Sequence, residues 1–443
     1  MRIRLAPIAA AAAAALLAGC GGGGSATGGE SAAGLVPADA AAFVSVNTDF
    51  SSGQLRSADD VLAKFPIRDE VLEYARKAIR EYGIDVDALR RSAGPEIDLA
   101  VLDEHAKLAA GFTRPKDEER FDRLLDRKGL LHARKSGWTV FARDQGALDA
   151  VKRAEEKLAD APAYEHATAK LPDEAIAKAY VAGRIVREAK HARWASAALL
   201  SHDDGFELQL HLNARGLPGA ESYRADLADA IPDGSVAALS FRDFGDALRR
   251  LAPATIPFLG VRVDELASAF DGEGILYVRP GALIPEVALV TEGGHGAAAL
   301  DRVVRALAPA NAAPTKTSIE GVTLNELVLG VVSILYGDVD GKLVVTDNAN
   351  AIRGLKTGDR PKLTEDDATF EAARDAVDMP DETNGWLYLN VEDGLPLVEA
   401  IAELANQKLP KVWAENLRAV RSVLVFGTRK GDVQTLVAFV QTR

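Results

Sequence analysis

The chain has a single cysteine, Cys20, among its 443 residues. An internal disulfide needs two thiols and a cysteine–metal site needs several, so this scarcity excludes both as sources of stability. The fold must therefore be held by core packing. The roughly 410 residues after the amino-terminal segment are enough for two domains of ordinary size.

Long hydrophobic runs are also lacking. The first apolar run, which follows Arg2 and Arg4, ends at Gly19 and is shorter than the roughly 20 residues of a membrane-spanning helix. The longest later run, residues 327–337, is shorter still and is followed by the turn sequence DVDGK. We interpret this run as a buried strand, and we expect no second membrane segment.

Positive charge is in deficit, with 52 Lys and Arg against 65 Asp and Glu. Loss of Arg2 and Arg4 with a signal peptide would leave 50 basic residues and a net charge of −15. This balance argues against nucleic-acid binding, which needs a basic face. It also argues against attachment to anionic lipid by charge.

Motifs for metal binding are weak. The pair His202 and His211 is expected to face across a hairpin, with His191 nearby, but zinc would need a further ligand and surface histidines are far commoner. The DVDGK sequence resembles the start of a calcium loop, but Lys342 and Ala349 stand where acidic residues are needed. We predict no metal and no cofactor. The seven histidines are His105, His132, His166, His191, His202, His211 and His295.

Catalytic motifs are equally sparse. The chain has no G-x-S-x-G elbow, and the glycines of residues 21–29 lack the Lys and strand context of a phosphate-binding loop. Acidic clusters at expected helix starts are interpreted as solvated faces that complement the helix dipole. Pairing of distant carboxylates in space is not visible in a sequence. We predict no catalytic residues.

The amino-terminal 19 residues are typical of a secretory signal, with a basic start, a short apolar run and small residues before the cleavage site. The sequence Leu17, Ala18, Gly19 and Cys20 resembles the bacterial lipobox, which lipoprotein signal peptidase recognises. This resemblance implies cleavage after Gly19 and a diacylglyceryl thioether on Cys20, with palmitate-type chains. An ordinary signal peptide with a chance cysteine is the alternative.

Residues 20–34 are rich in glycine and lack large apolar side chains. We interpret them as the acylated cysteine and a flexible tether, with a reach of about 20 Å. The expected location is the extracytoplasmic face of a cell membrane, in either the cell surface or the periplasm. The acyl chains would make the membrane contact, and the sequence does not identify a protein or small-molecule partner.

The remaining chain has two halves, residues 35–220 and 221–443, that repeat one order of predicted elements. The sequences LVPADAAAFVSV and AIPDGSVAALSF begin the halves, and helices and hairpins then follow in the same sequence. Short hairpins require antiparallel strands, and amphipathic helices must cover a sheet face. The sequence predicts two tandem α+β repeats, each a mostly antiparallel sheet with helices on one face.

This layout resembles a bacterial family known only as a domain of unknown function, number thirty-three fifty-two. The resemblance depends on LVPADAAAFVSV and the ordered blocks that follow, and covers nearly all of residues 35–443. Family members are often lipid-anchored or otherwise exported, and the family has no assigned catalytic residues. We therefore expect a non-catalytic binding or scaffolding module. A solute- or lipid-binding lipoprotein with a cleft between the halves, or an envelope hydrolase, are alternatives.

Duplication makes a structural prediction. The two sheets should share one strand order, because losing or inserting one strand would change which face of the next is covered. Different strand orders would contradict the duplication. Three pairs should lie on corresponding strands: Val44 with Ala238, Val140 with Val344, and Leu210 with Val437.

Overall fold

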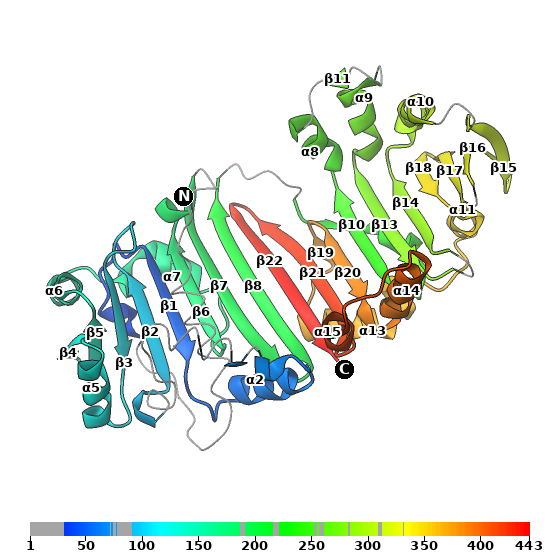
Figure 1. Cartoon of the computed structure of the whole chain (residues 1–443). Helices are drawn as coiled ribbons and strands as arrows, with labels where there is room; N and C mark the ends of the chain where they lie inside the picture. The colour runs from blue at the N-terminus through cyan, green and yellow to red at the C-terminus, as the bar shows by residue number, and fades with distance from the viewer. Residues whose placement is uncertain are drawn as a thin grey trace. The chain divides into compact units, whose positions relative to one another are not determined.

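The computed structural model describes residues 31–70, 72–73, 77, 91–186, 191–215, 221–251, 255–256, 261–281, 284–308, 312–330 and 332–443. The chain divides into two compact units, residues 1–217 with 431–443 and residues 218–430 (Figure 1). The expected signal peptide 1–19, with Leu17–Gly19, and Cys20 lie outside the described residues. The expected boundary at residue 220 lies close to the observed one.

Unit 1 contains one antiparallel sheet with the strand order β4-β5-β3-β2-β1-β6-β7-β8-β22. The strands are β1 Ala42–Asn47, β2 Glu96–Val101, β3 Ala109–Thr113, β4 Leu131–Lys135, β5 Trp138–Ala142, β6 Ala177–Ala182, β7 Ala192–His202, β8 Gly205–Ala214 and β22 Val433–Thr442. The helices are η1 Ala32–Gly34, α2 Gly53–Ala63, α5 Glu118–Arg127, α6 Gln145–Arg153, η2 Leu158–Asp160, α7 Pro162–Thr168 and η3 Gly183–Ile185.

Helices cover both faces of this sheet, so the expectation of helices on one face is wrong. Successive side chains of a strand point to opposite faces. Phe43 packs in the core that includes residues of η1, α6 and α7, whereas Val44 packs with Leu55 of α2. A sheet with apolar residues on both faces needs cover on both, and β1 carries such residues at consecutive positions.

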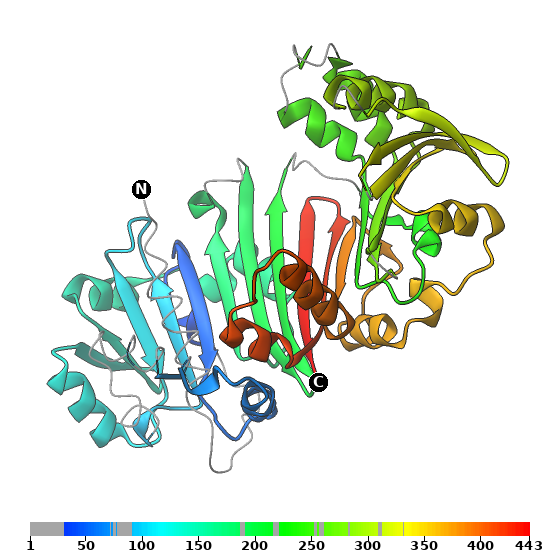
Figure 2. The same cartoon turned by 45° about the vertical axis from the view of Figure 1, so that its right-hand side comes forward.

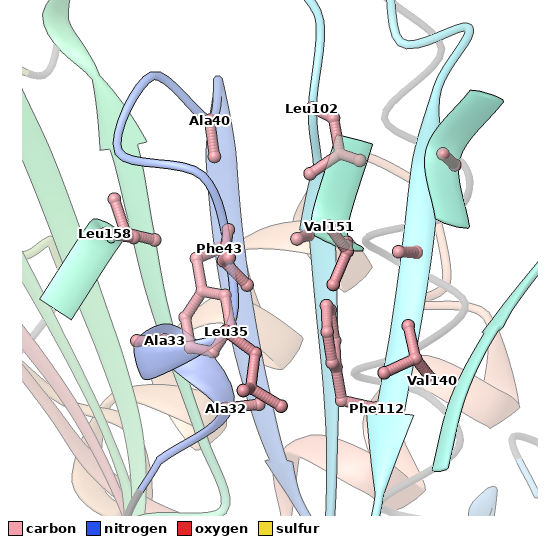
Figure 3. Packing of buried hydrophobic residues seen from close by; sticks show 14 of the residues in the cluster. Ala32, Ala33, Leu35, Ala40, Phe43, Leu102, Phe112, Val140, Val151 and Leu158 are labelled. Atoms are coloured by element: carbon pink, nitrogen blue, oxygen red, sulfur yellow. The ribbon is translucent and has the colours of Figure 1, made fainter. Parts of the chain in front are cut away.

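The fold begins earlier than expected, at Ser31 rather than Leu35. Ala32 and Ala33 are fully buried in the same core as Leu35 and Phe43 (Figure 3). The side chain of Ser31 accepts a hydrogen bond from the Ala33 N–H and caps η1. Residues 31–34 therefore belong to the folded unit and not to the tether, because small alanines fit where no large side chain would.

Unit 2 contains the strand order β15-β16-β17-β18-β14-β13-β10-β20-β21, again antiparallel. Its strands are β10 Ala237–Arg242, β13 Glu273–Arg279, β14 Glu286–Thr291, β15 Thr315–Ile319, β16 Val322–Leu329, β17 Val332–Val339, β18 Lys342–Thr346, β20 Trp386–Asn390 and β21 Val420–Lys430. Two further pairs are β9 Tyr223–Arg224 with β19 Glu382–Thr383, and β11 Thr255–Ile256 with β12 Val261–Arg262.

The helices of unit 2 vary in length from single turns to α14, which covers fourteen residues. Across the parts of the chain that are described, no helix combines the length and the apolar character needed to cross a membrane. The helices are η4 Asp226–Ala230, α8 Phe244–Leu251, α9 Val263–Ala267, η5 Ser268–Phe270, η6 Gly294–Gly296, α10 Ala297–Leu307, α11 Ala349–Thr357, α12 Leu363–Asp366, α13 Ala368–Ala376, α14 Val391–Leu404 and α15 Lys411–Leu417.

Seven strands follow the same pairing order in the two units, β4-β5-β3-β2-β1-β6-β7 in one and β17-β18-β14-β13-β10-β20-β21 in the other. Val140 and Val344 occupy the same register position, opposite Phe112 and Val290. Val44 lies on β1 and Ala238 on β10, but the registers match Val44 with Leu239. Val44 and Ala238 thus lie on corresponding strands as predicted, one register position apart.

The last strand does not belong to the second unit, as the range 221–443 had assumed. Strand β22 pairs with β8 of unit 1 from Val433↔Asn213 to Gln441↔Gly205. Leu210 and Val437 therefore lie on adjacent strands of one sheet, with Leu436 opposite Leu210 and Val437 opposite Gln209. The Gly205 position requires glycine because a Cβ there would lie 2.3 Å from the Val440 carbonyl oxygen, not because its φ is positive.

Two hairpins of unit 2 differ from the elements that its sequence predicts. The run 327–337 is not one buried strand, because it divides between β16 and β17 around Gly330, which has a φ of 67°. Strands β15 and β16, joined at Glu320 and Gly321, form a hairpin that was not expected. The turn expected at DVDGK is confirmed, with positive φ at Asp340 and Gly341.

The assignment of β22 to unit 1 predicts where a mutation acts. Phe439 is fully buried and packs edge-on to His202, at 5.5 Å between ring centroids. Phe439→Ala should lower the free energy of unfolding by about 3–5 kcal/mol. Urea unfolding followed by the fluorescence of the buried residues Trp138 and Trp194 would measure this loss. Leu436→Ala, at a 42% exposed position of the same strand, should cost much less. Equal losses would contradict the assignment.

Candidate functional site

The structure describes the place where the chain leaves the expected tether and enters the fold. Cys20 lies outside the described residues, and Ser31 is the first residue of the fold. The N–H of Ala32 donates to Oδ2 of Asp98 at 3.2 Å, and Asp98 is fully buried on β2. The start of the folded chain is therefore held by a buried carboxyl group of a central strand.

Asp98 lies in a small polar cluster at the pairing of β1 with β2. Ser45 stands opposite Asp98 in register, and its hydroxyl donates to Oδ1 of Asp98 and lies 3.0 Å from Oε1 of Glu96. Burial raises the pKa of Asp98 well above its ordinary value, and the charge of Glu96 raises it further. The hydrogen bonds from Ser45 and Ala32 oppose this shift. The cluster thus favours a protonated Asp98.

A second buried carboxyl group holds the corresponding part of unit 2. The N–H of Leu227, in η4, donates to Oε1 of Glu273 at 2.7 Å. Burial raises the pKa of Glu273 to about 7, and the charges of Glu292 and Asp226 add to this effect. Glu273 has the same register position on β13 as Glu96 on β2, opposite Arg242 and Asn47 respectively. The longer side chain of Glu273 makes the contact that Asp98 makes in unit 1.

Neither carboxyl group has the arrangement of a hydrolytic centre. A general acid or base must reach the reacting group of a substrate, whereas Asp98 is fully buried and Glu273 is 5% exposed. Both are used to bind backbone N–H groups at the first turn of a 3-10 helix. Their raised pKa values follow from burial, which the hydrogen bonds from these N–H groups oppose, and the pair gives no support to the envelope-hydrolase alternative.

The histidines considered for a metal site do not converge. On the β7–β8 hairpin, His202 stands opposite Gly205 and His211 opposite Ser196, so the expectation that they face each other is wrong. His191 is exposed at the start of β7. In the portion of the chain that is described, no cluster of three or more His, Cys, Asp or Glu residues is placed to hold a metal ion.

The two hairpin histidines instead have separate structural partners. Nε2 of His202 lies 2.7 Å from Oε2 of the buried Glu207, and this contact raises the pKa of His202 against the effect of burial. Nδ1 of His211 lies 2.9 Å from Oγ1 of Thr435 on β22, and burial lowers its pKa. The hydroxyl of Ser57 donates to the backbone carbonyl of His202, at 2.6 Å, and not to its ring. This geometry is not that of an activated serine.

No model of a known protein family matches the chain, and no curated protein matches it. Solved structures of TP0453 are similar to part of it. Crystal form I has 8% identity over 43% of this chain and 81% of that one, with a TM-score of 0.27. Crystal form III has 9% identity over 42% and 80%, with a TM-score of 0.25. At these values the similarity supports no argument about fold or function.

The pKa of Glu273 predicts a dependence of stability on pH. The unfolded chain releases this proton near 4.5 and the folded chain near 7, so the folded state binds more protons between these values. The free energy of unfolding should therefore fall as pH rises through this window, by at most about 3 kcal/mol from this group. Glu273→Gln should remove that part of the fall.

Urea unfolding of both proteins at a series of pH values would measure the difference in slope. Glu371→Gln, at an exposed position on α13, removes a carboxylate that has no buried contact and is the matched control. Parallel pH profiles for the natural protein and Glu273→Gln would contradict the proposed proton uptake.

Proposed function

We propose that this chain is an exported protein held at the extracytoplasmic face of a membrane by acyl chains on Cys20, where it acts as a non-catalytic binding or scaffolding module. One observation carries the proposal. The only cysteine of 443 residues stands at the end of a lipobox-like sequence, after a basic start and a short apolar run. Lipidation chemistry requires a thiol at this one position.

The start of the fold supports this proposal. Ten residues, 21–30, separate Cys20 from Ser31, and half or more of them are glycine. If this segment acts as the proposed tether, a glycine-rich chain of its length would reach about 17 Å, enough to clear lipid headgroups. The contact of Ala32 with Asp98 would then transmit any pull on the tether directly to the central strands β1 and β2.

We propose also that the two units derive from one duplicated α+β unit. Their shared strand order supports this, and so do equivalent details. Pro37 bridges to Lys157 and Pro232 to Lys362, just before β1 and β10. An edge-on aromatic pair joins a helix to a strand in each unit, Tyr164 with Tyr180 at 5.2 Å and Phe370 with Tyr388 at 5.0 Å. Membership of the family of unknown function, number thirty-three fifty-two, remains part of the same proposal.

Acylation is tested by fatty-acid labelling. The full-length chain, expressed in a bacterium with a clickable palmitate analogue, should carry the label. Cys20→Ala should carry none, because no other cysteine is present to form the thioether. The measurement is in-gel fluorescence of the purified protein. Ser25→Ala, in the glycine-rich segment, should keep the label and controls for expression and export. Equal labelling of the natural protein and Cys20→Ala would overturn the proposed anchor.

A further inference from the structure

Helices α14 and α15 contact one another (Figure 2). Both helices expose large apolar side chains. Leu404 at the end of α14 is 81% exposed, and Trp413 in the first turn of α15 is 67% exposed. Val398, Ile401 and Val412 are each about half exposed. Single exposed apolar residues are ordinary, whereas a group of five on two adjoining helices indicates a contact surface.

The exposed apolar residues of α14 lie along one side of the helix. Val398, Ile401 and Leu404 follow an i, i+3, i+6 spacing, and the partly buried Leu397 borders them. Leu395 is buried and fixes the opposite side of the helix, which contacts β20 and β21. The apolar stripe is therefore additional to the face that the fold itself uses.

The segment that joins the two helices carries two lysines. Residues 404–414, which we call the α14–α15 tip, contain Lys408 and Lys411 and no acidic residue, and Glu403 and Glu415 border the tip on its two sides. Both lysines are exposed. Lys411 lies 3.6 Å from Glu415, and an ion pair between exposed side chains adds little to stability. Net charge argues against attachment of the whole chain by charge, so the two lysines can supply only a local contact with anionic headgroups at the tip.

We infer that the α14–α15 tip inserts into the interface of an anionic lipid bilayer. Trp prefers the headgroup level, where its ring is half buried and its N–H remains hydrated. Leu404 and Val412 would enter the boundary of the acyl chains, and the two lysines would bind anionic headgroups.

This inference rests on the proposed function and deepens it, because the two acyl chains on Cys20 would hold the chain at the membrane and the tip would add a second, orienting contact. The anchor would bring the tip to the membrane, and insertion of the tip would fix which side of unit 2 faces the lipid. The tip itself contains no residue involved in acylation, so the two can be tested separately.

The four tryptophans make a direct test possible. Trp138, Trp194 and Trp386 are buried, so quenching of fluorescence by acrylamide reports mainly Trp413. The chain from Gly21 onward, expressed without its signal sequence, cannot be acylated and is mixed with vesicles. Vesicles of equimolar phosphatidylcholine and phosphatidylglycerol should protect Trp413 from acrylamide, and vesicles of phosphatidylcholine alone should protect it less.

Variants separate the two contributions. Leu404→Ser combined with Val412→Ser should weaken partition to both kinds of vesicle by about tenfold or more. Lys408→Gln and Lys411→Gln should each weaken partition by about fivefold, on anionic vesicles only. Leu307→Ser, at a 61% exposed position of α10, is the matched control and should have no effect. Urea unfolding curves verify that each variant is folded.

Three results would overturn the inference: no protection of Trp413 by vesicles, an equal loss of partition in Leu307→Ser, or protection that depends on protein concentration without vesicles. The last would indicate a second copy as the occupant. Labelling of Cys20 without protection of Trp413 by vesicles would support the lipid anchor and contradict insertion of the tip. Protection of Trp413 without a label on Cys20 would support insertion of the tip and contradict the lipid anchor.

Discussion

Backbone pairing of β1 along both of its edges determines most of unit 1. The strand is bound to β2 on one side and β6 on the other, with Val44 opposite Leu99 and Ala179. This register sends Phe43 to one face and Val44 to the other, and both are apolar. Each face must then be covered, by η1, α6 and α7 on one side and by α2 on the other. In unit 2, β10 lies in the same way between β13 and β20.

Because the sheet faces are covered, some backbone N–H groups of the covering 3-10 helices are buried and need hydrogen-bond acceptors inside the core. A short 3-10 helix that starts beneath a sheet has N–H groups without partners in the helix, and burial makes such groups costly. Asp98 and Glu273 supply acceptors to η1 and η4. Each buried N–H thereby gains an acceptor, and the acceptor is a buried carboxyl group with a raised pKa. Burying this carboxyl group costs less free energy than leaving the N–H without a partner, as long as the carboxyl group keeps its proton.

Local sequence patterns predicted most helices and strands. Contacts between segments far apart in the chain could not be predicted from the sequence. The Asp340–Gly341 turn follows from short-range chemistry. The hairpin of β15 and β16 was missed because its turn is Glu320–Gly321, a less typical pair for positive φ. Ala32 and Ala33 are buried in a core that includes residues more than sixty positions away, such as Phe112 and Val140. Gly205 is a glycine because the backbone of β22 lies close to it. In the sequence, a glycine needed for close approach looks the same as a glycine needed for a turn, so Gly205 did not reveal the pairing with β22.

The position of β22 also affects the order in which the protein can become complete. A ribosome or a secretion channel delivers the chain from its amino terminus, so residues 31–215 are available long before residues 433–442. Until the final ten residues of β22 arrive, β8 is an unpaired sheet edge that carries Leu208 and Leu210. Unit 2, residues 218–430, is delivered in between. The first unit to be synthesised is thus the last to be finished, and a chain that stops a few residues short leaves the early unit with an open edge.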